Sequence, residues 1–200
     1  FLFSCLFSMT IFAQNTVLPL WPNNIPNSIK TDEKEEVISA DIVRIAKVKV
    51  PQIEVYLPAK KNATGQAVLI FPGGGYGILA YDWEGTDFAK FLNGKGIAGI
   101  VVKYRLPSAK SQTDIHVVPL QDAQRAIRMV RSKAIEWNID PNNVGIIGFS
   151  AGGHLASTLG THYNEEVYPK KDTIDNLSAR PDFMTLAYPV IPMGEPNTHG

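Results

Sequence analysis

The chain has 200 residues, of which 44% are hydrophobic and 19% are charged, and its formal net charge at pH 7 is zero. This composition argues against a disordered chain, because disorder requires low hydrophobicity and high net charge. It also argues against nucleic acid as the main partner, because phosphate binding requires an excess of basic residues. The length suits about one domain with a sizeable core. The single cysteine, Cys5, excludes an intrachain disulfide.

The N-terminal segment predicts export. Residues 1–13 form one apolar run, and the first charged residue of the chain is Lys30. The run is too short to span a bilayer and is typical of the hydrophobic part of a secretory signal peptide, with cleavage near Ala13. We therefore interpret residues 1–13 as a partial signal peptide and expect the protein in the periplasm or outside the cell. A buried N-terminal element and lipidation at Cys5 are the alternatives.

The next segments predict a lead-in followed by strands. Residues 14–40 are rich in Pro and Asn and then in charged residues, which indicates an irregular surface segment. Residues 41–57 alternate apolar and polar around Pro51, which predicts two antiparallel strands. Residues 67–71 are continuously apolar, as in a strand that is buried on both faces. Residues 82–93 have a helical pattern with Trp83 and Phe91 on the apolar side.

Strands and helices alternate in the second half of the chain. Apolar runs predict buried strands at residues 97–103, 144–149 and 183–191. Apolar residues at helical spacing follow Pro119, and small residues predict a helix over 151–161. Such alternation predicts an α/β fold with a doubly wound, mostly parallel sheet over residues 41–200. We expect the last strands of this domain to be missing from the chain.

A serine lies between a predicted buried strand and a predicted helix. The segment Gly148-Phe149-Ser150-Ala151-Gly152 has the form G-x-S-x-G. In this context the turn is tight, and the Ser150 hydroxyl projects above the N-terminus of the following helix. Free amides and the dipole of that helix favour a negatively charged oxygen. The pattern therefore predicts a nucleophilic serine, and the alternative is an incidental serine in a strand–turn–helix unit.

A second glycine-rich loop follows the strand at residues 67–71. Its three consecutive glycines, Gly73 to Gly75, leave the backbone amides unobstructed by side chains. A dinucleotide-binding loop would need glycine where the chain has Ile78, and no G-K-[ST] sequence follows. We therefore expect an oxyanion hole formed by the amides of Gly74, Gly75 and Ala151, and a plain tight turn is the alternative.

The two loops together resemble those of the α/β-hydrolase family, in the hormone-sensitive-lipase-like branch. That branch has an H-G-G-G loop and a G-x-S-A-G-G elbow; this chain has Pro72 at the His position and a matching elbow from Gly148 to Gly153. The segment Tyr104-Arg105-Leu106-Pro107 is also similar. More narrowly, the chain resembles secreted bacterial acetylxylan or feruloyl esterases from about residue 40 to residue 200.

The resemblance implies a catalytic triad in the chain order Ser, Asp or Glu, His. In this family the acid and the histidine follow strands that lie beyond residues 183–191. We therefore expect both groups after Gly200, and we expect the isolated 200-residue chain to lack specific esterase activity. Five other candidates are interpreted as structural or surface side chains: Asp182, His116, His154, His162 and His199.

The resemblance also implies the reaction and its substrate. Ser150 would form an acyl-enzyme with acetyl or feruloyl esters on plant polysaccharides such as xylan. Tyr76 and Tyr81 follow the glycine-rich loop directly and would contact the substrate, with ordinary packing as the alternative. No cofactor, metal ion or membrane span is expected, and the partner is an acylated oligo- or polysaccharide. Two alternatives stay open: a serine peptidase of the same fold, and a binding module of this fold that has lost catalysis.

Overall fold

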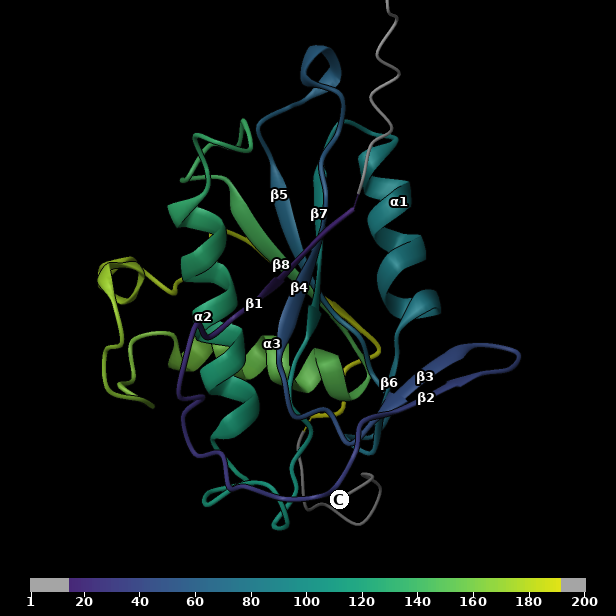
Figure 1. The fold of residues 1–200 in the computed structure, drawn as a ribbon. Coiled ribbons are helices and arrows are strands. Elements are labelled where there is room, and N and C mark those ends of the chain that lie inside the picture. Colours follow the sequence, from purple (N-terminus) through teal and green to yellow (C-terminus); the bar gives the residue numbers. More distant parts are fainter. Residues whose placement is uncertain (1–14, 192–200) are drawn as a thin grey trace, which may run out of the picture.

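A computed structural model describes residues 15–191 and shows one main sheet of six strands with helices on both faces (Figure 1). The strand order is β1-β4-β7-β5-β8-β9. The strands β7, β5, β8 and β9 are parallel, whereas β1 and β4 are antiparallel to their neighbours. The bounds are β1 Thr16–Pro19, β4 Gln52–Tyr56, β5 Ala67–Phe71, β7 Ala98–Lys103, β8 Val144–Phe149 and β9 Met184–Ala187. The predicted signal peptide and His199 lie outside the described residues.

The central strands are buried on both faces because their side chains are apolar in both directions. Every residue of β5 and of β7 is buried. Helix α1 (Asp87–Asn93) packs on one face, and α2 (Val118–Ser132) and α3 (Ala151–His162) pack on the other. Short 3₁₀ turns lie at Lys60–Asn62 and Thr173–Asn176. The doubly wound, mostly parallel sheet predicted from the sequence is confirmed.

A small second sheet lies beside the main one. It contains β2 (Glu36–Ser39), β3 (Val43–Ala46) and β6 (Ile78–Ala80), in the order β2-β3-β6. The β2–β3 hairpin projects from the body of the molecule (Figure 1). The two strands predicted within residues 41–57 are both present, but they do not pair, because β3 joins this small sheet and β4 joins the main one.

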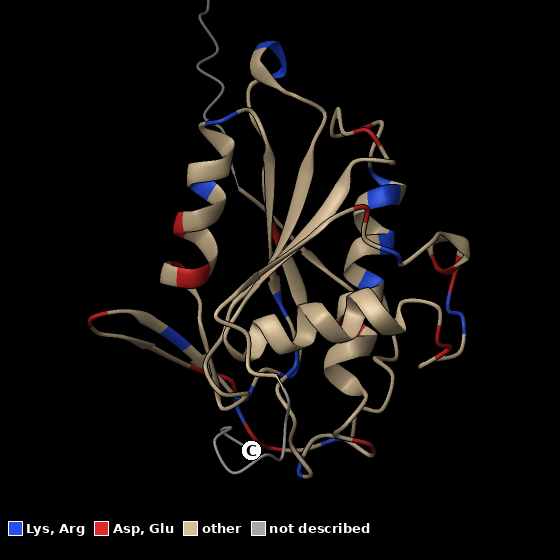
Figure 2. Cartoon of the chain, turned by 180° about the vertical axis from the view of Figure 1, so that it is seen from behind, with Lys and Arg blue, Asp and Glu red and all other residues tan. Residues whose placement is uncertain are grey.

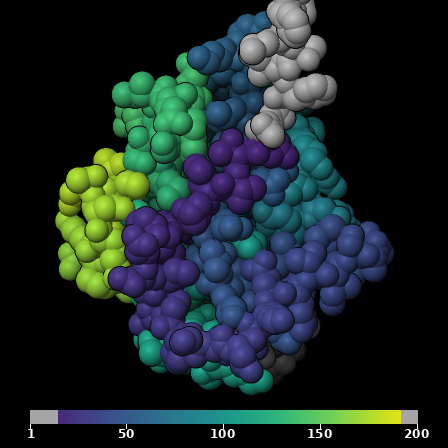
Figure 3. Space-filling view, in the orientation of Figure 1, coloured from purple at the N-terminus to yellow at the C-terminus, as the bar shows by residue number. Residues whose placement is uncertain are grey.

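The prediction of an irregular segment over residues 14–40 is wrong in two respects. The segment contributes β1 to the edge of the main sheet and β2 to the small sheet. It also buries Leu20 and Trp21, which are 0% and 4% exposed. Figure 3 shows this N-terminal stretch lying across the front of the molecule. The lead-in is therefore part of the packed domain.

The segment before α1 begins with a π-helical turn at Asp82–Thr86. The wider turn changes the register of the helix, and Trp83 and Phe91 are 67% and 58% exposed. Their predicted place on the buried side is therefore wrong. At the other end of the chain, the strand predicted over 183–191 is present but shorter, since β9 ends at Ala187.

Two buried ion clusters fix α2 against the rest of the domain. Asp122 is fully buried and accepts hydrogen bonds from the side chains of Trp21 and Arg105. Arg125, further along α2, pairs with Asp172 and Asp175. Figure 2 shows the basic residues of α2 beside the acidic loop that contains this pair. Within residues 15–191, no helix is long and apolar enough to cross a membrane.

Candidate active site

Ser150 occupies the sharp turn between β8 and α3. Its backbone has φ 50° and ψ −117°, a conformation that is strained for any residue other than glycine. The turn requires glycine at positions 148 and 152, because a neighbouring backbone oxygen occupies the space that a side chain would need at each position. A Cβ at Gly148 would lie 2.1 Å from the Gly152 oxygen, and a Cβ at Gly152 would lie 2.1 Å from the Phe71 oxygen. The predicted strand–elbow–helix geometry is therefore present.

The glycine-rich loop follows β5 and turns back immediately. The oxygen of Gly74 accepts hydrogen bonds from the amides of Gly77 and Ile78, which closes the turn. Gly74 has φ 131°, and a Cβ there would lie 2.2 Å from the Ile78 oxygen, so only glycine fits. Gly75 has φ 60° and faces open space. The buried Tyr104 hydroxyl donates to the Pro72 oxygen at 2.7 Å and anchors the start of the loop.

The loop and the elbow are in direct contact. A Cβ on Gly73 would lie 2.9 Å from the Cβ of Ser150. Ala151 follows Ser150 at the first position of α3, where helix amides have no partner within the helix. The amides of Gly74, Gly75 and Ala151 donate to no group among residues 15–191. The structure thus brings a serine together with unpaired backbone donors, an arrangement that suits a carbonyl oxygen on which negative charge develops.

Gly73 differs from the two glycines that follow it. Its amide donates to a carboxylate oxygen of Glu84 at 2.7 Å, so it is already engaged. Glu84 is not among the site residues predicted from the sequence. Glu84 follows the glycine-rich loop in the sequence, but no known motif places a functional carboxylate at this distance from such a loop.

Tyr76 directly follows Gly75 at the end of the glycine-rich loop and has φ 57°. Its hydroxyl hydrogen-bonds the Nδ1 atom of His154, at 2.8 Å. Burial raises the pKa of Tyr76 and lowers the pKa of His154, which favours the neutral form of both groups. Both side chains line a largely apolar cavity of about 400 Å³, together with residues from the α2 N-terminus.

The remaining candidates lie away from Ser150 or have structural roles. Asp182 precedes β9, pairs with Arg131 and accepts a hydrogen bond from the Val144 amide, at the end of the sheet opposite the elbow. His162 ends α3 and contacts Thr158, Thr161 and Glu165. His116 lines the apolar cavity. The contacts of Asp182 and His162 agree with their interpretation as structural or surface groups, whereas His116 lies on the wall of the cavity beside Tyr76 and His154.

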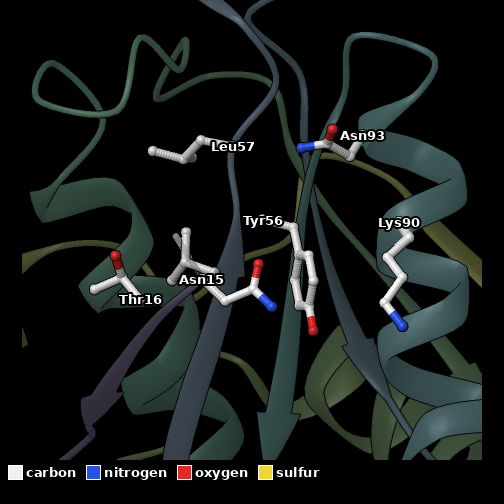
Figure 4. Close-up of a pocket in the computed structure, with 7 residues that line it drawn as sticks. Asn15, Thr16, Tyr56, Leu57, Lys90 and Asn93 are labelled. Carbon is white, nitrogen blue, oxygen red and sulfur yellow. The ribbon is translucent and has the colours of Figure 1, made fainter. Parts of the chain in front are cut away.

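Another cavity, of about 280 Å³, lies at the opposite end of the sheet between β1, β4 and α1 (Figure 4). Tyr56, which lines it, pairs with Gly99 at the start of β7, whereas Ser150 follows the end of the parallel β8. This cavity is therefore remote from the elbow. Residues 15–191 contain no cluster of three or more His, Cys, Asp or Glu side chains that could hold a metal ion.

Comparison with known proteins agrees with this geometry. The chain is 42% identical over 148 residues to an acetylxylan esterase of Xylanibacter ruminicola, a match that covers 74% of this chain and 27% of the relative. It is 33% identical over 145 residues to endo-1,4-beta-xylanase B of Butyrivibrio fibrisolvens, covering 72% and 22%. The chain thus spans about a quarter of the length of these curated relatives.

Among solved structures, an acetyl ester-xyloside bifunctional hydrolase from Caldicellulosiruptor lactoaceticus is similar, with a TM-score of 0.69 and 34% identity. The match covers 91% of this chain and 60% of that one. The family model BD-FAE matches residues 53–184, which contain both the glycine-rich loop and the serine elbow. The chain has the α/β-hydrolase fold predicted from its sequence, and it belongs to the BD-FAE family.

Proposed function

We propose that the protein is an exported serine esterase that removes acyl groups from plant polysaccharides such as xylan, with Ser150 as the nucleophile. The observation that carries the proposal is the contact between the strained Ser150 and a glycine loop with unengaged amides. The names of the relatives support the substrate class, since they include an acetylxylan esterase and an acetyl ester-xyloside hydrolase.

In this proposal the Ser150 hydroxyl attacks the ester carbonyl and forms a tetrahedral intermediate. The amides of Gly74, Gly75 and Ala151 donate to its oxyanion, and removal of one such donor typically costs about 2.7–4 kcal/mol of transition-state stabilisation. The intermediate collapses to an acyl-enzyme with release of the sugar hydroxyl, and water then releases the acid.

The proton of Ser150 requires a general base. Within residues 15–191, no histidine side chain hydrogen-bonds the Ser150 hydroxyl, and the nearest in sequence, His154, is bonded to Tyr76. The proposal therefore requires a histidine and an orienting acid from outside this segment, in the chain order of the fold. Without that base, most covalent catalysis is lost and only binding and oxyanion stabilisation contribute.

The substrate would be an acetyl or feruloyl ester, and Tyr76 would contact it from the apolar cavity beside the loop. The cavity is lined mainly by apolar side chains, which suits an uncharged acyl group or sugar better than an ionic ligand. No metal ion or cofactor takes part in the proposed reaction, because the serine, the amides and the base together supply the chemistry.

The test is an activity profile of the complete gene product. Acetate release from acetylated xylan and ferulate release from methyl ferulate are measured for the wild type and for Ser150→Ala. The proposal predicts ester hydrolysis that falls by about 10³-fold or more in the variant. Cleavage of proline-containing peptides without ester hydrolysis would indicate a peptidase. Binding of xylan with no hydrolysis of any substrate would indicate a binding module.

A further inference from the structure

One carboxylate connects two segments that are far apart in the sequence and lie on either side of Ser150. The Glu84 Oε2 atom accepts from the Gly73 amide at 2.7 Å. Its Oε1 atom accepts from the Tyr188 hydroxyl at 2.6 Å. Both distances are short, as expected when the acceptor is charged. Glu84 therefore links the glycine-rich loop to the segment that follows β9.

The local fold places Glu84 beside the glycine-rich loop. The residue lies in the π-helical turn Asp82–Thr86, where the amide of Thr86 donates to the oxygen of Tyr81, five residues earlier. Such turns occur frequently at functional sites. The next residue, Gly85, packs closely on Pro72, since a Cβ there would lie 3.3 Å from the proline ring. This close approach brings the turn against the start of the glycine-rich loop.

The last residue of β9 and the segment that follows it are hydrogen-bonded to the elbow. The Ser150 amide donates to the Ala187 oxygen at 3.1 Å, and the Val190 amide donates to the Ser150 oxygen at 3.2 Å. Between these two contacts, Tyr188 has φ 36°, which is strained for a tyrosine. Its side chain is 65% exposed, and the hydrogen bond to Glu84 fixes the position of its hydroxyl.

We propose that Glu84 is a positioning residue that fixes the glycine-rich loop relative to Ser150, through Gly73 on one side and Tyr188 on the other. The inference rests on the proposed function, because its consequence is the alignment of oxyanion donors with the nucleophile. Both carboxylate oxygens are used in holding backbone and hydroxyl groups, so Glu84 acts through the loop and not on the substrate.

The physical reason is that oxyanion donors are effective only at the right distance. They must lie about 2.7–3.1 Å from the oxyanion. The amide of Gly74 directly follows the residue that Glu84 holds, and glycines have few steric limits of their own. When the carboxylate is removed, the Gly73 amide loses its partner and the loop gains alternative conformations. Misplacement by about 1 Å can cost about 100-fold in rate.

Three variants test this inference in the complete protein with p-nitrophenyl acetate. Glu84→Ala removes both hydrogen bonds, and we expect kcat to fall about 10- to 100-fold while KM changes less than about threefold. Glu84→Gln keeps a carbonyl oxygen for the Gly73 amide and should recover a large part of this loss. Tyr188→Phe removes only the hydroxyl and should give a smaller decrease in kcat.

The matched control is Asp87→Asn, an exposed carboxylate three residues further along, whose partner is Lys90. We expect its kcat to equal that of the wild type. Wild-type hydrolysis together with a kcat for Glu84→Ala within twofold of the wild-type value would overturn the inference and leave the proposed function intact. Absence of hydrolysis in the wild type would refute the proposed function itself.

If Glu84→Ala fails to fold, the kcat of Tyr188→Phe tests the positioning role instead. The phenylalanine retains the ring contact with Phe149 at 6.0 Å between centroids, so thermal unfolding should be nearly unchanged. A reduced kcat at unchanged melting temperature supports the positioning role. An unchanged kcat in Tyr188→Phe contradicts it.

Discussion

Replacing Gly152 by alanine should favour helix α3 but disturb the contact between the elbow and the glycine-rich loop. Gly152 lies in the first turn of α3, where alanine is the better helix former by about 0.5–1 kcal/mol. A Cβ at this position, however, would lie 2.1 Å from the Phe71 oxygen and 2.6 Å from the Pro72 oxygen. Both atoms belong to the backbone that leads into the glycine-rich loop, so no side-chain rotation relieves the overlap.

The overlap requires the loop and the elbow to separate by roughly 1.4 Å, since non-bonded heavy atoms in close-packed protein lie about 3.5 Å apart or more. Overpacking of this kind costs about 1–3 kcal/mol, which exceeds the gain in helix propensity. We therefore expect Gly152→Ala to lower the free energy of unfolding by about 1–2 kcal/mol relative to the wild type. The displacement of the loop should lower kcat by about 100-fold.

The control is Gly160→Ala in the same helix. A Cβ at Gly160 would meet the Met184 Sδ and Cε atoms at 2.9 and 3.2 Å, and this flexible side-chain end can move. Urea unfolding and ester hydrolysis are measured for both variants of the complete protein. Gly160→Ala should retain stability and kcat. A kcat for Gly152→Ala within threefold of the wild-type value would contradict this prediction.

Three further predictions concern groups outside the reacting centre. Asp122→Ala leaves the buried Arg105 without its carboxylate, and urea unfolding should show a loss of about 3–5 kcal/mol. The hydrogen bond from Arg125 lowers the pKa of Asp172. The stabilisation by this carboxylate is therefore present above the unfolded pKa of about 4 and is lost as the pH falls through the lower folded pKa. The difference in melting temperature between the wild type and Asp172→Asn should accordingly disappear at low pH; a constant difference would contradict this. Burial lowers the pKa of His154, so its NMR titration should show a midpoint below about 6.5, and protonation there should favour the unfolded chain.

The central strands and the elbow could be predicted because their signals are local. β5 and β8 coincide with apolar runs that are followed by Pro72 and Ser150, so the end of each strand can be predicted from the sequence. The serine, the glycines and the flanking elements also lie within short segments. Such signals need no knowledge of which distant residues will meet.

The errors have equally specific causes. Trp83 lies within the π-helical turn, where a pattern based on 3.6 residues per turn does not apply. Phe91 lies in the regular helix α1 and is exposed, although its neighbour Leu92 is buried. β2 was missed because all of its residues are exposed, which leaves no apolar alternation to detect. The contacts of Glu84 join residues 11 and 104 positions apart, and nothing in their spacing predicts them.

The central claim is that Ser150 is the nucleophile of an ester hydrolase. The most direct test is incubation of the complete protein with paraoxon, followed by peptide mass spectrometry. The account predicts one diethylphosphoryl group, located on Ser150, a loss of esterase activity in proportion to labelling, and no adduct in Ser150→Ala. Full esterase activity in Ser150→Ala, or an adduct on a different residue that accounts for the loss of activity, would contradict the account.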